Sequence, residues 1–304
     1  GEGVLTWYGV EYPIVDGDGN MDWNLVRSML IHPIFNAVTA HEIGHTLGLR
    51  HNFMGSFDAL NYGGEYWNLR NDGNMRPRAW DPITEAELDG RILENQTSSV
   101  MDYGVNFVVT DANGIGHYDR AALKMGYGDL VEVFTNAADS DEVQFWNWGQ
   151  TDWLGPVRFE SFLNNSERPT FHTYTEWPSV LGSVDAIQQR ADVPYSSIVN
   201  GNSMEFAQLG IDFRSRDAEG RPMVPYMFGT DDNADLGPDN MRYDQGADVY
   251  ETIQSVSDNY WNFYPFSHFR RQRIGFSTEG VAGRSSGRYF SKLTSANQIY
   301  ALYR

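Results

Sequence analysis

The sequence contains no cysteine and only two lysines, Lys124 and Lys292, and each scarcity excludes a class of protein. Without cysteine the chain cannot form a disulfide, an iron–sulfur cluster, a Cys-ligated zinc site or a thiol nucleophile. The 22 basic residues stand against 41 acidic ones, a net charge of −19, so the basic footprint that nucleic-acid backbones require is missing. No apolar run approaches the roughly 20 residues of a membrane-spanning helix. We therefore expect neither a nucleic-acid partner nor a transmembrane segment.

Bulky apolar side chains, by contrast, are plentiful. Hydrophobic residues make up 41% of the 304 positions, including 17 Phe, 17 Tyr and 9 Trp, which is enough to bury a core and excludes wholesale disorder. A chain of this length is typical of about two domains. We place a boundary near residue 130, beyond which the sequence becomes Trp-rich and is punctuated by proline.

Local patterns predict an α+β chain. The β-branched and aromatic residues 3–12 predict a strand, and Pro33 suits the first turn of a helix that continues to about Leu47. Further helices are predicted over residues 84–94, 118–125, 180–190 and 247–273, the last interrupted at Pro265.

One motif carries specific chemistry, because residues 41–51 fit HExxHxxGxxH at every specified position. His41 and His45 lie one helical turn apart, so their imidazoles face one point. Gly48 can adopt a positive φ, which turns the chain sharply and brings His51 round as a third nitrogen ligand. Three neutral imidazoles suit one Zn²⁺ and leave its fourth tetrahedral position open for water, as in catalytic sites. Glu42 lies beside that position and can accept a proton as general base.

This motif resembles that of the metzincin clan of zinc endopeptidases, and two later stretches agree with it. Residues 99–103, Ser-Val-Met-Asp-Tyr, resemble the Met-turn, which implies that Met101 forms an apolar floor beneath the zinc ligands. In metzincins with a tyrosine two residues after that methionine, the phenol ligates zinc or supports the tetrahedral intermediate. The resemblance therefore implies a catalytic role for Tyr103. Residues 119–128 resemble the helix that closes metzincin catalytic domains.

More narrowly, residues 41–62, 98–103 and 116–127 resemble the large bacterial zinc-dependent metalloproteases called met-zincins. Shorter stretches between residues 226 and 271 resemble a downstream helical region of those proteins. A cysteine pair often stands in that region in relatives, where this chain has Gly229 and, approximately, Asn240.

The resemblance implies a metzincin-like zinc protease domain over residues 1–130 and a mainly helical, loop-rich extension over residues 131–304. Metzincins have a fuller N-terminal sheet than the residues before His41 can supply, so we expect an incomplete sheet portion and a slice of a longer, processed chain. Residues 3–12 are then expected to be the edge strand that pairs with extended substrate.

A second metal site is weakly indicated. Asp16, Asp18, Asn20 and Asp22 have the oxygen spacing of a Ca²⁺ loop, but the later positions of the loop depart from the calcium-binding pattern. A plain solvated turn is the alternative. Residues 231–235 leave the same two alternatives open.

The sequence thus predicts a zinc-dependent endopeptidase that hydrolyses peptide bonds of proteins through a zinc-activated water, with Glu42 as general base and Tyr103 supporting the oxyanion. The alternative is a catalytically silent zinc-binding surface or matrix protein that keeps the fold for structure or binding. We expect an extracellular or cell-surface location with the signal peptide already removed. The expected partners are protein or peptide substrates in extended conformation and the rest of the processed chain itself.

Overall fold

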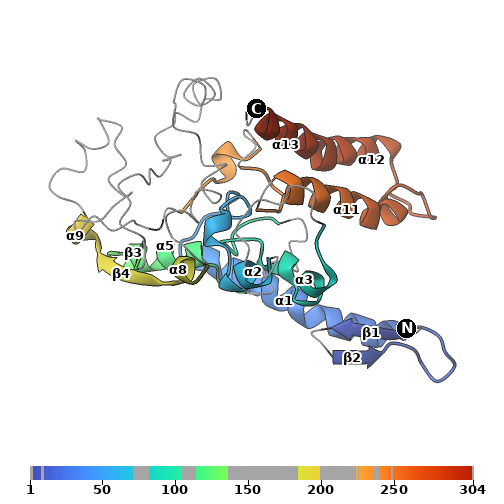
Figure 1. Ribbon diagram of the computed structural model, residues 1–304. Helices are drawn as coiled ribbons and strands as arrows, with labels where there is room; N and C mark the ends of the chain where they lie inside the picture. The colour runs from blue at the N-terminus through green and yellow to red at the C-terminus, as the bar shows by residue number, and fades with distance from the viewer. Residues whose placement is uncertain are drawn as a thin grey trace.

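The computed structural model describes residues 3–7, 10–70, 82–104, 114–135, 184–198, 224, 226–235, 240–247 and 249–302. Within these ranges helices predominate, and two small antiparallel sheets accompany them (Figure 1). This mixture agrees with the predicted α+β class. No helix in the described ranges is long and apolar enough to cross a membrane.

The N-terminal segment is a hairpin rather than the single strand that we predicted. Strand β1 (Val4–Trp7) pairs antiparallel with β2 (Val10–Pro13), with Leu5 opposite Tyr12. Uniform β-branched and aromatic composition indicates extended backbone but cannot show where the chain reverses. The hairpin lies at the end of the molecule at which the next helix begins (Figure 1). Its pairing with substrate stays a prediction.

The helix that carries the motif, α1 (Trp23–Thr46), begins earlier than predicted. Asp22 starts it, because its carboxylate accepts hydrogen bonds from the backbone N–H groups of Asn24 and Leu25 at 3.0 and 3.1 Å. Pro33, expected in the first turn, lies inside the helix instead. The carboxylate of Asp22 accepts hydrogen bonds from backbone N–H groups that have no partner within the first turn of the helix. The helix then continues through Pro33, although proline has no N–H group and removes one internal hydrogen bond.

Short helices and loops follow around a compact core. They are η1 (Ala59–Asn61), α2 (Gly64–Leu69), α3 (Glu85–Asp89) and η3 (Ile92–Asn95). The helix predicted over residues 84–94 is split, because Arg91 adopts a left-handed conformation with φ 64° and ends the helical path of α3. Thr84 and Glu87 cap the start of α3 reciprocally.

The chain beyond residue 114 adds a helix and a second sheet. Helix α5 (His117–Gly128) is slightly longer than the predicted 118–125 and leads into β3 (Leu130–Phe134), which pairs antiparallel with β4 (Arg190–Pro194). Of the helix predicted over residues 180–190, only α8 (Val184–Gln188) is helical in the described part, and a strand follows at once. Helix α9 (Tyr195–Ile198) continues from β4.

The helix predicted over residues 247–273 is present over a shorter range and is not interrupted at Pro265. Helix α11 (Val249–Ser267) ends soon after Pro265, and α12 (Thr278–Ser285), the π-helical turn η7 (Ser286–Phe290) and α13 (Ser291–Leu302) form a continuous helical run beside it (Figure 1). A one-turn 3-10 helix, η6 (Asp231–Asn233), precedes them.

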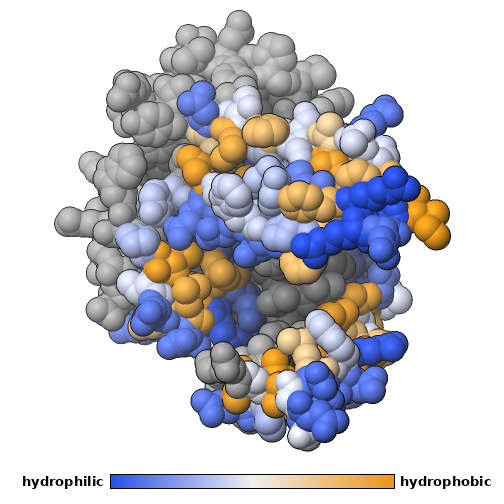
Figure 2. Space-filling view, turned by 90° about the vertical axis from the view of Figure 1, so that its right-hand side faces the viewer, coloured by the Kyte–Doolittle hydropathy of each residue, from blue (hydrophilic) through white to orange (hydrophobic). Residues whose placement is uncertain are grey.

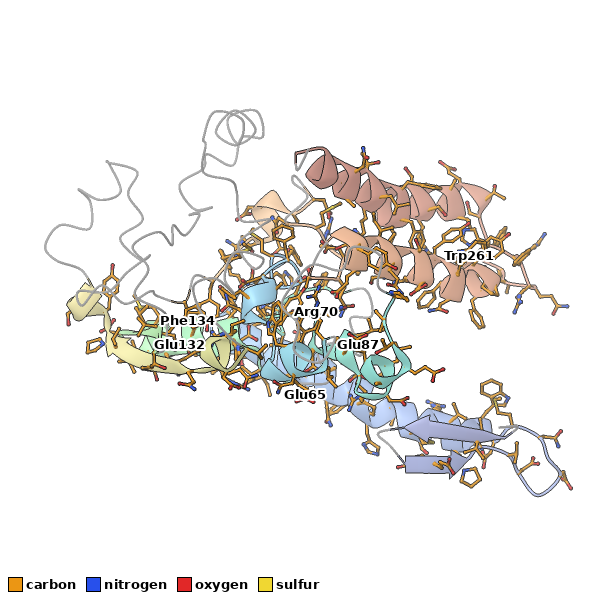
Figure 3. All side chains as sticks on the ribbon, viewed as in Figure 1. Glu65, Arg70, Glu87, Glu132, Phe134 and Trp261 are labelled. Carbon is orange, nitrogen blue, oxygen red and sulfur yellow. The ribbon has the colours of Figure 1, made fainter. Side chains whose placement is uncertain are left out.

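Buried contacts join this helical part to the earlier chain. Arg70 at the end of α2 forms an ion pair with Glu251 of α11 at 3.1 Å, and both side chains are only 1% exposed (Figure 3). Tyr66 donates a hydrogen bond to the same carboxylate. The main core likewise contains residues from both sides of residue 130: Tyr62, Tyr66, Trp67, Ile92, Phe134, Ile187, Val224 and Ala247 are among its members. The domain boundary near residue 130 stays a prediction.

Candidate metal centre

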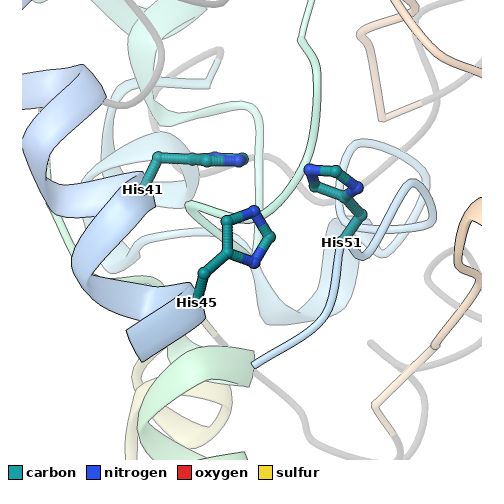
Figure 4. Close-up of side chains that lie close together, drawn as sticks. All are labelled: His41, His45 and His51. Carbon is teal, nitrogen blue, oxygen red and sulfur yellow. The ribbon is translucent and has the colours of Figure 1, made fainter. Parts of the chain in front are cut away.

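The three histidines of the motif converge at the end of α1. His41 and His45 come from the last turns of the helix and His51 from the loop that follows (Figure 4). One ligand nitrogen from each lies within 4.8 Å of the others, which is the spacing expected around a single ion. Among the residues that the structure describes, these three histidines are the cluster of side chains that could hold a metal ion.

Each of these rings has one nitrogen already occupied. His41 Nδ1 lies 2.7 Å from the carbonyl oxygen of Val100, and His45 Nδ1 lies 3.0 Å from that of Leu49. Since a carbonyl can only accept, both Nδ1 atoms donate, which assigns the tautomer and leaves each Nε2 without a proton. Three neutral imidazoles with one nitrogen each near a common point are a donor set that fits a zinc ion.

Gly48 makes the third ligand possible. It has φ +89°, a conformation that glycine adopts without steric cost. Leu49 donates a backbone hydrogen bond to the carbonyl of Gly44 at 3.0 Å, which closes the end of the helix and reverses the chain. The turn predicted at Gly48 is therefore present, and it directs His51 back toward the two helical histidines.

Met101 packs directly beneath the helix. Its side chain is fully buried, and a methyl group placed on Gly44 would collide with its sulfur. Its carbonyl accepts a hydrogen bond from Asn52 N at 2.9 Å, just after the third histidine. The segment that resembles a Met-turn thus contacts the motif both below the helix and at the following loop.

Asp119, which the sequence did not single out, holds the Met-turn in place. Its two carboxylate oxygens accept hydrogen bonds from Ser99 Oγ and Val100 N, each at 2.7 Å, and Gly116 N donates a third at 2.8 Å. Burial raises the pKa of Asp119, and these three hydrogen bonds act in the opposite direction. The closing helix α5 therefore fixes the carbonyl that orients His41.

Tyr103 lies beside the third histidine of the centre. Its hydroxyl oxygen is 3.0 Å from His51 Nε2, so the phenol lies beside the point on which the ligands converge. Burial raises the pKa of Tyr103, and the negative charges of Asp231 and Glu42 raise it further. The hydroxyl therefore stays protonated near neutral pH and is available as a hydrogen-bond donor.

Glu42 lies between the two helical histidines in sequence, and its side chain is exposed. Its charge is one of the causes that raise the pKa of Tyr103, after burial and the charges of Tyr243 and Asp231. As an exposed carboxylate it is accessible to water.

A segment far downstream completes the centre. Asp231 lies 2.8 Å from His51 Nδ1, a contact that spans 180 positions of sequence. Burial raises the pKa of Asp231, but the hydrogen bond and charge interaction with His51 outweigh it, and the net shift is downward. Gly229 N donates to Asn52 Oδ1 at 3.1 Å, and Phe53 N donates to the carbonyl of Gly229 at 2.7 Å.

The two positions at which relatives often carry cysteines also meet here. A Cβ atom on Gly229 would collide with the side-chain amide of Asn240. The segments that contain Gly229 and Asn240 are therefore in direct contact, and this chain has no cysteine with which to join them.

Calcium binding is not supported. Asp16 Oδ1 accepts hydrogen bonds from the backbone of Asp18 and Asn20 at 3.0 and 2.9 Å, as in an ordinary turn, and Asp22 caps α1. In the second candidate loop, Asp231 binds His51, Asp232 pairs with Arg50 and Asp235 pairs with Arg242. The carboxylates of both loops thus serve partners within the chain.

Comparison with known proteins gives one match. The sequence model of the Met-zincin family matches residues 26–61, which include the motif and most of its helix. No curated protein and no solved structure matches the chain. The match and the three converging histidines support a metzincin-like family and zinc metallopeptidase-like chemistry.

Proposed function

We propose that the chain is a zinc-dependent endopeptidase whose centre is formed by His41, His45 and His51. The observation that carries the proposal is the convergence of one nitrogen from each of three imidazole rings whose Nδ1 atoms are held by oxygen acceptors. Such preorganisation is typical of a catalytic zinc site with three protein ligands.

The roles of the surrounding residues follow from their positions. Zinc held by the histidines would lower the pKa of a coordinated water and polarise the scissile carbonyl. Glu42 accepts the proton of the attacking water and later delivers it to the leaving amine. Tyr103 donates its hydroxyl hydrogen to the oxygen on which negative charge develops. Met101 supports the helical histidines from below and takes no part in proton transfer.

The substrate and setting belong to the same proposal. An open, partly exposed centre suits a peptide in extended conformation, and the net charge of −19 favours solubility outside the cell. We infer an extracellular or cell-surface protease of the bacterial met-zincin type, with residues 1–130 as the catalytic part and residues 131–304 as its helical extension.

The test is hydrolysis of an unfolded protein by the full chain, with and without a zinc chelator, and after zinc is added back. Glu42→Gln should keep one equivalent of zinc and lower kcat by about 10²-fold or more, because it removes the base and leaves the ligands unchanged. Glu65→Gln is a matched control, since Glu65 is also an exposed helical glutamate.

Retention of activity in Glu42→Gln within about a factor of ten would contradict the assigned mechanism. Stoichiometric zinc binding without any hydrolysis by the unmodified chain would instead favour the catalytically silent zinc-binding protein.

A further inference from the structure

We propose that Asp231 is a positioning residue for the metal centre. Its carboxylate accepts the Nδ1 hydrogen of His51 and thereby fixes the orientation and tautomer of the third ligand. This inference rests on the proposed function in one respect, namely that the three histidines hold zinc.

The need for such a residue arises from the position of His51 in the chain. His41 and His45 belong to α1, and their rings are held by backbone carbonyls. His51 follows the turn at Gly48 and lies outside any helix, so its backbone constrains the ring less. Its Nδ1 faces a carboxylate at 2.8 Å, and charge-assisted hydrogen bonds are stronger than those to neutral carbonyls. A carboxylate partner also makes the opposite nitrogen a better metal ligand.

Asp231 is held in this position by an antiparallel series of contacts. His51 pairs with Asp231 at 2.8 Å, and the residue after His51, Asn52, pairs with Gly229 at 3.1 Å. Asn52 is fully buried and also donates from Nδ2 to the carbonyl of Met227 at 3.0 Å. Two segments separated by most of the chain therefore pair residue by residue across the third ligand.

An ordinary surface ion pair is the competing explanation. The side chain of Asp231 is 53% exposed, and pairs with that much exposure contribute little to folding stability. The two explanations differ in what they predict, because a positioning role concerns the affinity for metal whereas a surface pair has no influence on it. Zinc affinity therefore decides between them without reference to catalysis.

The experiment measures the zinc dissociation constant of the full chain by competition with a chromophoric chelator. Asp231→Ala should weaken zinc binding by about 10- to 100-fold, as loss of an outer-shell carboxylate does. Asp231→Asn should weaken it less, by roughly 3- to 10-fold, because its amide oxygen can still accept the hydrogen bond without the charge. Asp231→Glu should recover part of the affinity lost in the alanine variant.

Asp232→Asn is the matched control. It makes the same charge change on the adjacent residue and removes an ion pair with Arg50, yet it should leave the zinc dissociation constant within about twofold. The absorption spectrum of the cobalt-substituted protein should change in Asp231→Ala and stay unchanged in Asp232→Asn. Only the first variant removes the hydrogen-bond partner that orients the ligand His51. Thermal unfolding of the metal-free variants checks that the fold is retained.

Equal zinc affinities in Asp231→Asn and Asp232→Asn would overturn the inference, and this comparison remains decisive if the alanine variant fails to fold. Failure of the proposed function has a different signature. If the unmodified chain binds zinc and Asp231→Ala weakens it, but Glu42→Gln stays active, the catalytic assignment is wrong and the role of Asp231 stands.

Discussion

The two halves of α1 have opposite surroundings, although they form one helix. In the first half Trp23, Ile31 and Ile34 are 69%, 48% and 37% exposed. In the second half Ala37 and His41 are 1% and 2% exposed. Helix formation in the first half depends on a local cap at Asp22, whereas the second half is fixed by chain segments far away in sequence.

The difference also concerns which segments surround each half. The first half lies at the same end of the molecule as the hairpin (Figure 1), and Figure 2 shows a face of the molecule on which hydrophobic side chains are scattered among hydrophilic ones. The second half contacts Val100 and Met101, and the loop that follows it binds Asp231. The three histidines therefore lie where the local sequence motif also makes several contacts with residues that are distant in sequence. A helix alone would present two histidines but would not orient them.

The largest effect expected from these tests of the two halves comes from Tyr103, whose hydroxyl lies beside His51, just after the second half of α1. Tyr103→Phe should lower kcat by roughly 10- to 10³-fold, because it removes one donor to the developing oxyanion, with little change in zinc content. KM should change much less, since the interaction belongs mainly to the transition state.

Steady-state kinetics on a peptide substrate measure both constants. Tyr195→Phe, which removes a hydroxyl from helix α9, should alter neither. An unchanged kcat in Tyr103→Phe would reduce the phenol to a packing residue.

Gly44 gives a test of packing beneath the second half. Gly44→Ala places a methyl group against the sulfur of the buried Met101, and such overpacking should lower the free energy of unfolding by about 1–3 kcal/mol. Gly126→Ala in α5 is the control, because no atom lies within 4 Å of the new methyl group. That substitution should instead stabilise the protein by about 0.5–1 kcal/mol through helix propensity.

Denaturant unfolding of the two variants measures this difference in sign. Destabilisation by Gly126→Ala equal to that by Gly44→Ala would show that Met101 does not pack tightly beneath the ligands.

The sequence predicted the parts of the site that depend on local geometry. The spacing of His41, His45 and Gly48 is set by helical periodicity and by one backbone conformation, so both the convergence of the ligands and the turn were foreseeable. Tyr103 was placed by resemblance to a short motif, and its hydroxyl does lie beside His51.

The residues that orient the ligands could not be predicted in the same way. Asp119 and Asp231 act across 19 and 180 positions of sequence, and no spacing rule links them to Val100 or His51. The carboxylates of residues 231–235 indicate either a calcium loop or a solvated turn, and neither interpretation predicts a contact with His51. The start of α1 differs from the prediction for another reason: Pro33 is favourable in a first turn, and Asp22 was interpreted as part of a solvated turn or a calcium loop rather than as a helix cap.

The smallest expected effect comes from Asp22, at the exposed end of α1. Asp22→Ala removes the acceptor for the N–H groups of Asn24 and Leu25, and loss of such a cap costs about 1 kcal/mol of helix stability. If the first half of the helix is stabilised mainly by this local cap, the loss should be confined to it. Backbone amide hydrogen exchange should therefore become faster over residues 24–28 by about fivefold, while the amides near His41 keep their protection. Equal acceleration along the whole helix would show that the two halves open as one unit, because the contacts with Met101 would then depend on the cap as well.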